Sequence, residues 1–384
     1  MEKENKVFRI GPIRPPSEAN SLLLQMTAGC TWNKCKFCQL YRKSPFRAYT
    51  VESIKNDIDV IAYYAELASR HMTADGSYDR NGLMSELHAM SEDEQNCFYM
   101  VFNWLSHGGE NVFLQDGNSL ALKAERVEEV LLYLKSKFPG IKRITTYGRA
   151  ETLSKITAEQ YRALKAAGLE RIHSGFESGS DKVLTLINKG VTSEQEITAG
   201  RNIKAAGIEF SVYFMPGVGG KDLSQENALG TARVINEIDP DFIRIRTTVV
   251  TKTSELWQML QEGTYQLCSD NDKIMEIRTL IENSSGCSGM LVNGDHIINL
   301  LPEVNGRLDL ENHKMLAIID EYLALPKKDQ RIYQLARRTG MVSGIADIKN
   351  LPGNRRAEFE RIADSIENEK EWDETINKMM RRFI

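Results

Sequence analysis

The sequence predicts an α/β fold in which parallel strands alternate with helices. Short apolar runs recur along the chain up to Val249, and stretches with apolar residues at helical spacing follow them. Glycine or proline ends several helical stretches, as at Pro139-Gly140 and Gly168. Consecutive strand–helix units form parallel sheets, because two parallel strands need a long crossover connection.

Each predicted strand leads to one edge of the sheet. The predicted strands cover residues 21–27, 112–115, 143–147, 171–176, 208–215 and 242–249. The predicted helices cover residues 51–72, 123–137, 157–167, 181–188, 194–206, 224–238 and 272–283. Such units build either an open, doubly wound sheet or a barrel, and the alternation by itself leaves both open. In either case we expect binding groups at the carboxyl ends of the strands.

The composition is that of an ordinary globular protein. Of its 384 residues, 41% are hydrophobic and 27% are charged, and the formal net charge is −4. This mildly acidic balance disfavours nucleic acid as the main partner, because nucleic-acid-binding proteins usually carry a basic excess. No apolar stretch approaches the roughly 18 residues of a membrane span, and the first residues lack the apolar core of a secretory signal. We therefore expect a cytoplasmic protein with reduced cysteines and no membrane partner.

Three cysteines lie close together in the stretch TAGCTWNKCKFCQL, residues 27–40. Cys30, Cys35 and Cys38 are spaced C-x4-C-x2-C, and the other three cysteines are isolated in sequence. Structural zinc sites use four ligands, usually in two pairs, and no second pair is present. A [4Fe–4S] cluster normally takes four thiolates, so three thiolates leave one iron open to another molecule. A non-catalytic iron–sulfur or zinc protein remains the alternative to an enzyme.

This motif resembles that of the radical S-adenosylmethionine (SAM) superfamily. Its usual spacing is C-x3-C-x2-C with an aromatic residue before the third cysteine, and Phe37 occupies that place. The sequence departs by one extra residue between Cys30 and Cys35. The resemblance implies a partial (β/α)6 TIM-like barrel with a mostly helical C-terminal extension. It also implies a [4Fe–4S] cluster held by Cys30, Cys35 and Cys38, SAM at the open iron, and Phe37 near the adenine.

The implied activity is that of a radical SAM oxidoreductase, transferase or lyase. In that superfamily the reduced cluster cleaves SAM to a 5′-deoxyadenosyl radical, which abstracts hydrogen from the substrate. We expect a small organic substrate, an electron donor such as flavodoxin or ferredoxin, and sensitivity to oxygen. A radical SAM enzyme that modifies RNA is a further alternative. The predicted organisation is an extension over residues 1–19, the barrel over 20–255, and a C-terminal region over 256–384 that covers the barrel opening.

The segment after the second predicted strand is a candidate for binding the SAM amino group. It contains Gln115, Asp116, Gly117 and Asn118, which offer acceptor oxygens beside a glycine. The superfamily's Gly-Gly-Glu also occurs, at residues 108–110, but it precedes the strand and so lies at the wrong end. A plain strand-to-helix turn is the alternative interpretation of the later segment.

The next two strand ends carry further candidates for binding SAM. Tyr147 and Arg149 follow the third strand, although Arg149 fits a surface ion pair equally well. The stretch Gly-Phe-Glu-Ser-Gly-Ser after the fourth strand resembles one in methylthiotransferases, Elongator-like proteins and oxygen-independent coproporphyrinogen oxidases. This resemblance implies that Glu177 contacts the ribose or methionine part of SAM. It also places Lys189 near the SAM carboxylate, where a cation is favourable, although a helix C-terminal charge is the alternative.

The candidates for catalysis are Tyr213, His296 and Asn299. His296 and Asn299 belong to a polar group among apolar neighbours, which resembles an Asn-His-x-x-Asn stretch in uncharacterised radical SAM oxidoreductases. In the functional interpretation these groups bind substrate or position a proton. In the alternative interpretation the segment is a turn with a hydrogen-bonded structural histidine.

Overall fold

The protein contains one mixed sheet whose strand order follows the chain. The computed structural model describes residues 6–383. The order is β1 (Leu22–Gln25), β4 (Asn111–Gln115), β5 (Arg143–Tyr147), β6 (Leu169–Glu177), β7 (Glu209–Phe214), β8 (Phe242–Ile245), β9 (Met290–Val292) and β10 (Gly306–Arg307). The pairs β1–β4, β4–β5, β5–β6, β7–β8 and β8–β9 are parallel, and β9–β10 is antiparallel. The predicted α/β class with parallel strands is confirmed.

Helices follow the strands as the periodicity predicts, and each predicted helix is present to within a few residues. Their bounds are α1 (Val51–Arg70), α2 (Arg80–His88), α3 (Glu92–Ser106), α4 (Ala124–Lys137), α5 (Ala150–Leu153), α6 (Ala158–Ala166), α7 (Asp181–Leu186), α8 (Ser193–Ala205), α9 (Ser224–Ile238), α10 (Glu255–Gln261), α11 (Asp270–Glu282), α12 (Asn312–Leu323), α13 (Lys327–Arg338), α14 (Gly353–Ser365) and α15 (Glu369–Met380). Among residues 6–383, no helix combines the length and apolar character needed to cross a bilayer.

Helices α2 and α3 were not predicted. A usable signal was present, because Ser91 and Glu94 form a capping box at the start of α3. The same helix carries the buried residues Phe98 and Trp104 on its inner face. An S-x-x-E pattern before an apolar run is a helix start that sequence reading can detect.

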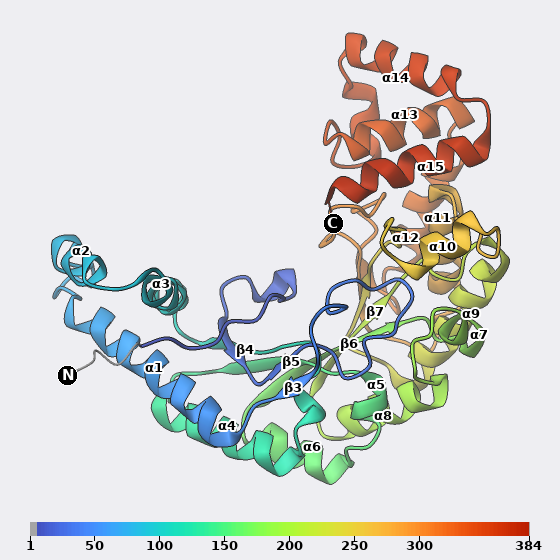
Figure 1. Cartoon of the computed structure of the whole chain (residues 1–384). Coiled ribbons are helices and arrows are strands. Elements are labelled where there is room, and N and C mark those ends of the chain that lie inside the picture. Colours follow the sequence, from blue (N-terminus) through green and yellow to red (C-terminus); the bar gives the residue numbers. More distant parts are fainter. Residues whose placement is uncertain (1–5, 384) are drawn as a thin grey trace. The chain divides into compact units, whose positions relative to one another are not determined.

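The chain divides into two compact units. The first holds the described residues up to Thr31 together with Lys43–His173 and Ala205–Glu209. The second holds Trp32–Arg42, Ser174–Lys204 and the chain from Phe210 onward. In the first unit α1 packs against α3 and α4, and in the second α13 packs against α14 and α15 (Figure 1).

The strand–helix alternation that the sequence shows up to Val249 is followed by one further parallel strand. The sixth predicted strand ends at Ile245, and β9 adds a further parallel strand beside β8 through the pairs Phe242–Met290 and Ile243–Leu291. Strand β9 has only three residues, which is too short for an alternating pattern to stand out. The polar group around His296 therefore also follows a strand end.

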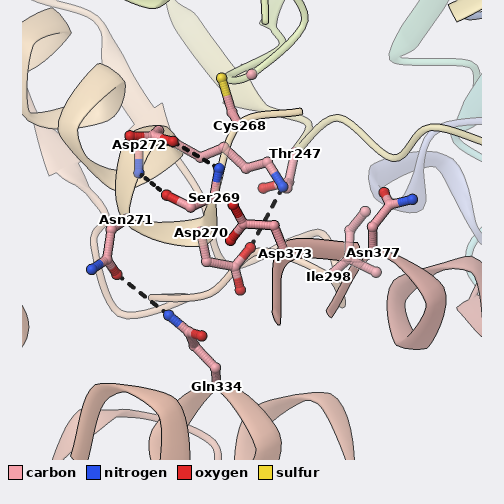
Figure 2. A network of polar contacts seen from close by, with 12 residues as sticks. Thr247, Cys268, Ser269, Asp270, Asn271, Asp272, Ile298, Gln334, Asp373 and Asn377 are labelled. Carbon is pink, nitrogen blue, oxygen red and sulfur yellow. Dashed lines mark hydrogen bonds and ion pairs between the residues drawn. The ribbon is translucent and has the colours of Figure 1, made fainter. Parts of the chain in front are cut away.

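The C-terminal helices are attached within the second unit through the start of α11 (Figure 2). Ser269 caps this helix in a capping box with Asp272, and the Asn271 side chain accepts a hydrogen bond from Gln334 of α13 at 3.3 Å. From α15, the Asn377 amide donates to the Val250 carbonyl and accepts from the Val250 N–H. The predicted boundary at residue 255 stays a prediction.

Candidate functional site

The cysteine loop is closed at its base by two short strands, β2 (Thr27–Ala28) and β3 (Arg47–Ala48), which pair antiparallel. None of the three loop cysteines is in a disulfide, and Cys35 is buried. Cys30 belongs to the first unit, and Cys35 and Cys38 belong to the second. Within residues 6–383, no three His, Cys, Asp or Glu side chains are gathered so as to hold a metal ion. The fit to an iron–sulfur cluster thus rests on donor chemistry: three cysteine side chains on one loop, the ligand type that such clusters prefer.

The guanidinium of Arg42 fixes the backbone between Cys35 and Cys38. Its Nη2 donates to the Cys35 carbonyl at 2.8 Å, and its Nε donates to the Cys38 carbonyl at 3.1 Å. The same Nη2 lies 2.8 Å from Oε1 of Glu255, the first residue of α10. Both bonds to the cysteine residues are made to their backbone carbonyls, and the bond to Glu255 holds the guanidinium in place. No sequence signal pointed to Arg42.

The loop also docks on the C-terminal end of α7. The indole Nε1 of Trp32 donates to the Asn188 carbonyl at 2.7 Å, and the Lys36 N–H donates to the Ile187 carbonyl at 2.9 Å. A Cβ on Gly190 would lie 2.4 Å from the Trp32 ring, so this position requires glycine. Gly190 has φ +67°, a conformation that also favours glycine.

Three residues predicted to bind SAM come together beside this docking site. Nζ of Lys189 lies 2.8 Å from Oε1 of Glu177 and 5.7 Å from the centre of the Phe37 ring. A Cβ on Gly175 would lie 2.3 Å from Oε1 of Glu177, so the space for this ion pair exists because residue 175 is glycine. Glu177 itself has φ 66°, unusual for a residue with a side chain.

A further carboxyl group, Glu196 of α8, lies behind this pair and was missed. It is fully buried, and neither of its side-chain oxygens has a hydrogen-bond partner among the described residues. Burial raises the pKa of Glu196 well above its usual range, and the charge of Glu177 adds to the rise while Lys189 opposes it. Burial therefore favours the neutral form of Glu196.

In the first unit, Asn118 links two strand ends to the cysteine loop. Its Nδ2 donates to Oγ1 of Thr31 at 3.0 Å and to Oγ1 of Thr152 at 2.8 Å, and its Oδ1 accepts from the Arg149 N–H at 3.1 Å. Nη1 of Arg149 lies 3.3 Å from the same Thr31 hydroxyl and 3.8 Å from Glu151. The predicted residues Asn118 and Arg149 thus meet next to Cys30.

The neighbours of Asn118 on the same turn have different contacts. Oδ2 of Asp116 accepts from the Gly29 N–H in the cysteine loop at 3.3 Å. The buried Gln115 side chain bonds the backbone of Gly11 and Ile13 instead. Gly117 lies between Asp116 and Asn118. Their roles in SAM binding stay predictions, and the bonds of Gln115 give it a structural role as well.

The remaining candidates of the first unit are also placed. The Tyr147 ring packs edge-on against Phe113 and His173, with ring centres 5.2 and 5.7 Å apart. The tripeptide at residues 108–110 lies between α3 and β4, before the strand as predicted. Glu110 pairs there with Lys142 at 2.6 Å.

Of the candidates for catalysis, Tyr213 lies near the end of β7, and His296 and Asn299 follow β9. The Tyr213 ring lies under Arg246, whose Cζ is 4.8 Å from the ring centre. Asn299 accepts from the N–H and hydroxyl of Thr247 and donates to the carbonyls of Ile245 and Asn293, so both groups of its amide are engaged.

His296 lies beside the same arginine. Burial and the charge of Arg246 lower the pKa of His296 to about 4, so its ring is neutral at physiological pH. Its Nδ1 is buried without a hydrogen-bond partner among the residues described. Sequence reading missed Arg244 and Arg246, although the alternation in Phe-Ile-Arg-Ile-Arg indicates one polar face of a strand.

The family of the chain can be decided from a comparison with protein-family models. The model described as "Radical SAM superfamily" matches residues 24–231, which is more than half of the chain. The chain belongs to the radical SAM superfamily. The predicted family is thereby confirmed, together with its cofactors, a [4Fe–4S] cluster and SAM. The matched region begins in β1, includes the cysteine loop and ends in α9.

Individual relatives match the chain at low identity. A tRNA uridine(34) acetyltransferase of Methanocaldococcus jannaschii is 26% identical over 28% of this chain and 20% of its own length. A 4′-phospho-dehydrooxetanocin synthase of Priestia megaterium is 27% identical over 68% of this chain and 30% of its own length. A solved structure of the cobalamin-dependent SAM radical enzyme OxsB is 15% identical in sequence to this chain. The match covers 94% of this chain and 55% of the OxsB chain, with a TM-score of 0.46. The chain thus spans at most about a third of these curated relatives.

Proposed function

We propose that this radical SAM chain is an enzyme that uses its cysteine loop and the Lys189–Glu177 pair to hold the cofactors for a radical reaction. Cys30, Cys35 and Cys38 would hold the cluster, whose reduced form, when bound, supplies the electron that cleaves SAM. The observation that carries the proposal is the contact of Lys189 with both Phe37 of the cysteine loop and Glu177 at the end of β6.

The polar residues of this site have separate tasks. Lys189 supplies a cation for the SAM carboxylate, and Glu177 supplies acceptor oxygens for the ribose or the methionine part. Phe37 offers a ring face to the adenine. Separately, within the first unit, Asn118 and Arg149 bond the Thr31 hydroxyl next to Cys30. Arg42 holds the backbone of the loop through the carbonyls of Cys35 and Cys38.

A small organic molecule is the substrate that we favour. The relative matching over two thirds of this chain is named as a synthase of 4′-phospho-dehydrooxetanocin, a small molecule, whereas the tRNA acetyltransferase matches over less than a third. The net charge of −4 supports the same choice. An RNA substrate is the second candidate, supported by the name of that acetyltransferase. A flavodoxin or ferredoxin would supply the electron, and cysteines outside disulfides agree with a reducing cytoplasm.

The proposal is tested by assaying SAM cleavage. The protein is purified without oxygen, reconstituted with iron and sulfide, reduced with dithionite and given SAM, and 5′-deoxyadenosine is measured. We expect the wild type to form it, and Cys30→Ala, Cys35→Ala and Cys38→Ala each to abolish it. The matched control is Cys97→Ala, which changes a buried cysteine outside the loop and should retain cleavage. Cluster absorbance and 5′-deoxyadenosine both absent from the wild type would overturn the proposal.

A further inference from the structure

Two arginines on one face of the sheet share a single carboxylate. Arg244 lies in β8 and Arg246 follows directly after it, so both side chains point to the same face. Nη1 of Arg246 lies 2.6 Å from Oδ1 of Asp295, and its Nη2 lies 3.4 Å from Oδ2. Nη1 of Arg244 pairs with Oδ2 of the same Asp295. The two guanidinium groups thus bind both oxygens of one carboxylate, and the same arrangement can bind any oxyanion.

We call the side chains of Arg244, Arg246 and Asp295 the clamp. The sheet at the clamp is polar on the face that carries the arginines and apolar on the opposite face. Ile243 and Ile245 alternate with the arginines and are fully buried on the opposite face. On the arginine side, Ser211 of β7 accepts from Nε of Arg244 at 3.1 Å, and the Tyr213 ring lies against Arg246.

Positive charge outweighs negative charge at the neighbouring His296. After burial, the charge of Arg246 is the largest influence that lowers the pKa of His296, and it exceeds the opposing effect of Asp295. Burial raises the pKa of Asp295, but its bonds and charge interactions with Arg246 and Arg244 outweigh burial and keep the carboxyl ionised. The clamp therefore joins two arginines to one ionised carboxylate, so that positive charge exceeds negative charge there.

The clamp is accessible and firmly positioned. The side chains of Arg246 and Asp295 each keep 18% of their surface exposed, whereas Arg244 keeps 7%. Asn299 bonds the Ile245 carbonyl on one side and the Asn293 carbonyl on the other, which ties the end of β8 to the segment carrying Asp295. In parallel α/β folds, the carboxyl ends of strands are where ligands bind.

We infer that Arg244 and Arg246 bind an oxyanion group of the substrate, a carboxylate or a phosphate, and that Asp295 occupies this position until substrate arrives. The inference rests on the proposed function, because it names the substrate class of that enzyme. Tyr213 and His296 would then lie beside the bound anionic group, and Asn299 would be a positioning residue for the clamp.

The test titrates the anaerobically reconstituted holoprotein with phenyl phosphate and with benzoate by calorimetry, with benzyl alcohol as the neutral probe. We expect one or both anions to bind and the alcohol not to bind. Arg246→Met should weaken anion binding at least tenfold, and Asp295→Asn should strengthen it, because the competing carboxylate is lost. Arg246→Lys serves as a milder variant if Arg246→Met does not fold. The matched control is Arg278→Met, which removes an arginine from an ion pair with Asp320 on α12.

Binding of phenyl phosphate identifies a phosphate as the group, and binding of benzoate identifies a carboxylate. The inference is overturned if neither anion binds, or if Arg246→Met and Asp295→Asn bind it as the wild type does. The titration needs no SAM cleavage, so the two proposals fail separately. Anion binding without 5′-deoxyadenosine formation would contradict only the proposed function, and the converse result would contradict only this inference.

Discussion

Lys189 and Glu177 form an ion pair of 2.8 Å on the face of the Phe37 ring, at the place where the cysteine loop docks on α7. Both side chains are largely buried. A buried cation with one carboxylate partner is a suitable receptor for a second carboxylate, because the ligand can share or replace the partner. The following predictions concern this pair, its surroundings and the strand ends.

Lys189→Met should weaken SAM binding strongly. The variant removes the cation for the SAM carboxylate, and a hydrogen bond to a charged group contributes about 1.5–3 kcal/mol, which corresponds to roughly a 10- to 100-fold change in affinity. Equilibrium binding of SAM to the reconstituted protein measures it. Lys182→Met is the matched control, because Lys182 also lies on the α7 segment but pairs with Glu226 at the surface. Equal SAM affinity in the wild type and Lys189→Met would contradict the assigned role.

Gly175→Ala should disturb the pair without unfolding the protein. The added methyl group would lie 2.3 Å from Oε1 of Glu177 and 3.4 Å from Nζ of Lys189, so the carboxylate must move. We expect SAM affinity to fall several-fold while the melting temperature changes by only a few degrees. At Gly140 a Cβ would meet nothing within 4 Å, which makes Gly140→Ala the matched control. If both variants bind SAM alike, the space at residue 175 is not needed.

Trp32→Ala should loosen the cysteine loop. The variant removes the ring that packs on Gly190 and the hydrogen bond to the Asn188 carbonyl. We expect the cluster to be lost several-fold faster, because a freely moving loop exposes its thiolates to oxygen and chelators. The decay of cluster absorbance after addition of a chelator measures this. Trp32→Phe keeps much of the packing and should be intermediate, and a decay rate in Trp32→Ala like that of the wild type would refute the docking role.

His296→Gln should reduce the loss of stability in mild acid. The folded protein holds the pKa of His296 near 4, below the ordinary value of about 6.5, so the unfolded chain takes up the proton first. Stability is therefore lost as the pH falls from 6.5 to 4, and His296→Gln removes this contribution. Melting temperatures measured across that range should drop less in His296→Gln than in the wild type. His313→Gln changes an exposed histidine on α12, and its melting temperature should fall as much as that of the wild type. Parallel curves for all three proteins would contradict the prediction.

His296 also has a predicted catalytic role, which has its own test. His296→Ala should impair product formation while leaving SAM cleavage largely intact, because His296 lies with Arg246 and Tyr213 rather than with the Lys189–Glu177 pair. Product and 5′-deoxyadenosine measured in one reaction separate the two effects. Unchanged product formation would leave His296 as a structural histidine.

The extra residue of the C-x4-C-x2-C spacing has a structural counterpart. The four residues between Cys30 and Cys35 include Trp32, which docks on α7, and Asn33, which adopts φ 52°. Nδ2 of Asn33 donates to the Tyr41 carbonyl, so the loop folds back on itself here. Asparagine tolerates this left-handed conformation better than most residues.

The sequence alone determined the strand–helix alternation, the cysteine loop and the superfamily. Those features depend on local patterns: apolar periodicity, the Gly and Pro that end helices, and the spacing of three cysteines. The sequence also placed Glu177 and Lys189 at a strand end and beyond the following helix, which is why their meeting could be expected from family resemblance. Strand β9 was not predicted, because three residues are too few to show an alternating pattern.

Only the tertiary structure decided which side chains meet across the sequence. Asp295 lies far along the chain from Arg244 and Arg246, and β9 brings them together by pairing with β8. Glu196 became a buried acid because its side chain lies on the buried face of α8. Arg42 became the support of the loop because α10 begins beside it. Burial and charge pairing depend on contacts between distant segments, and such contacts are not encoded in any local pattern.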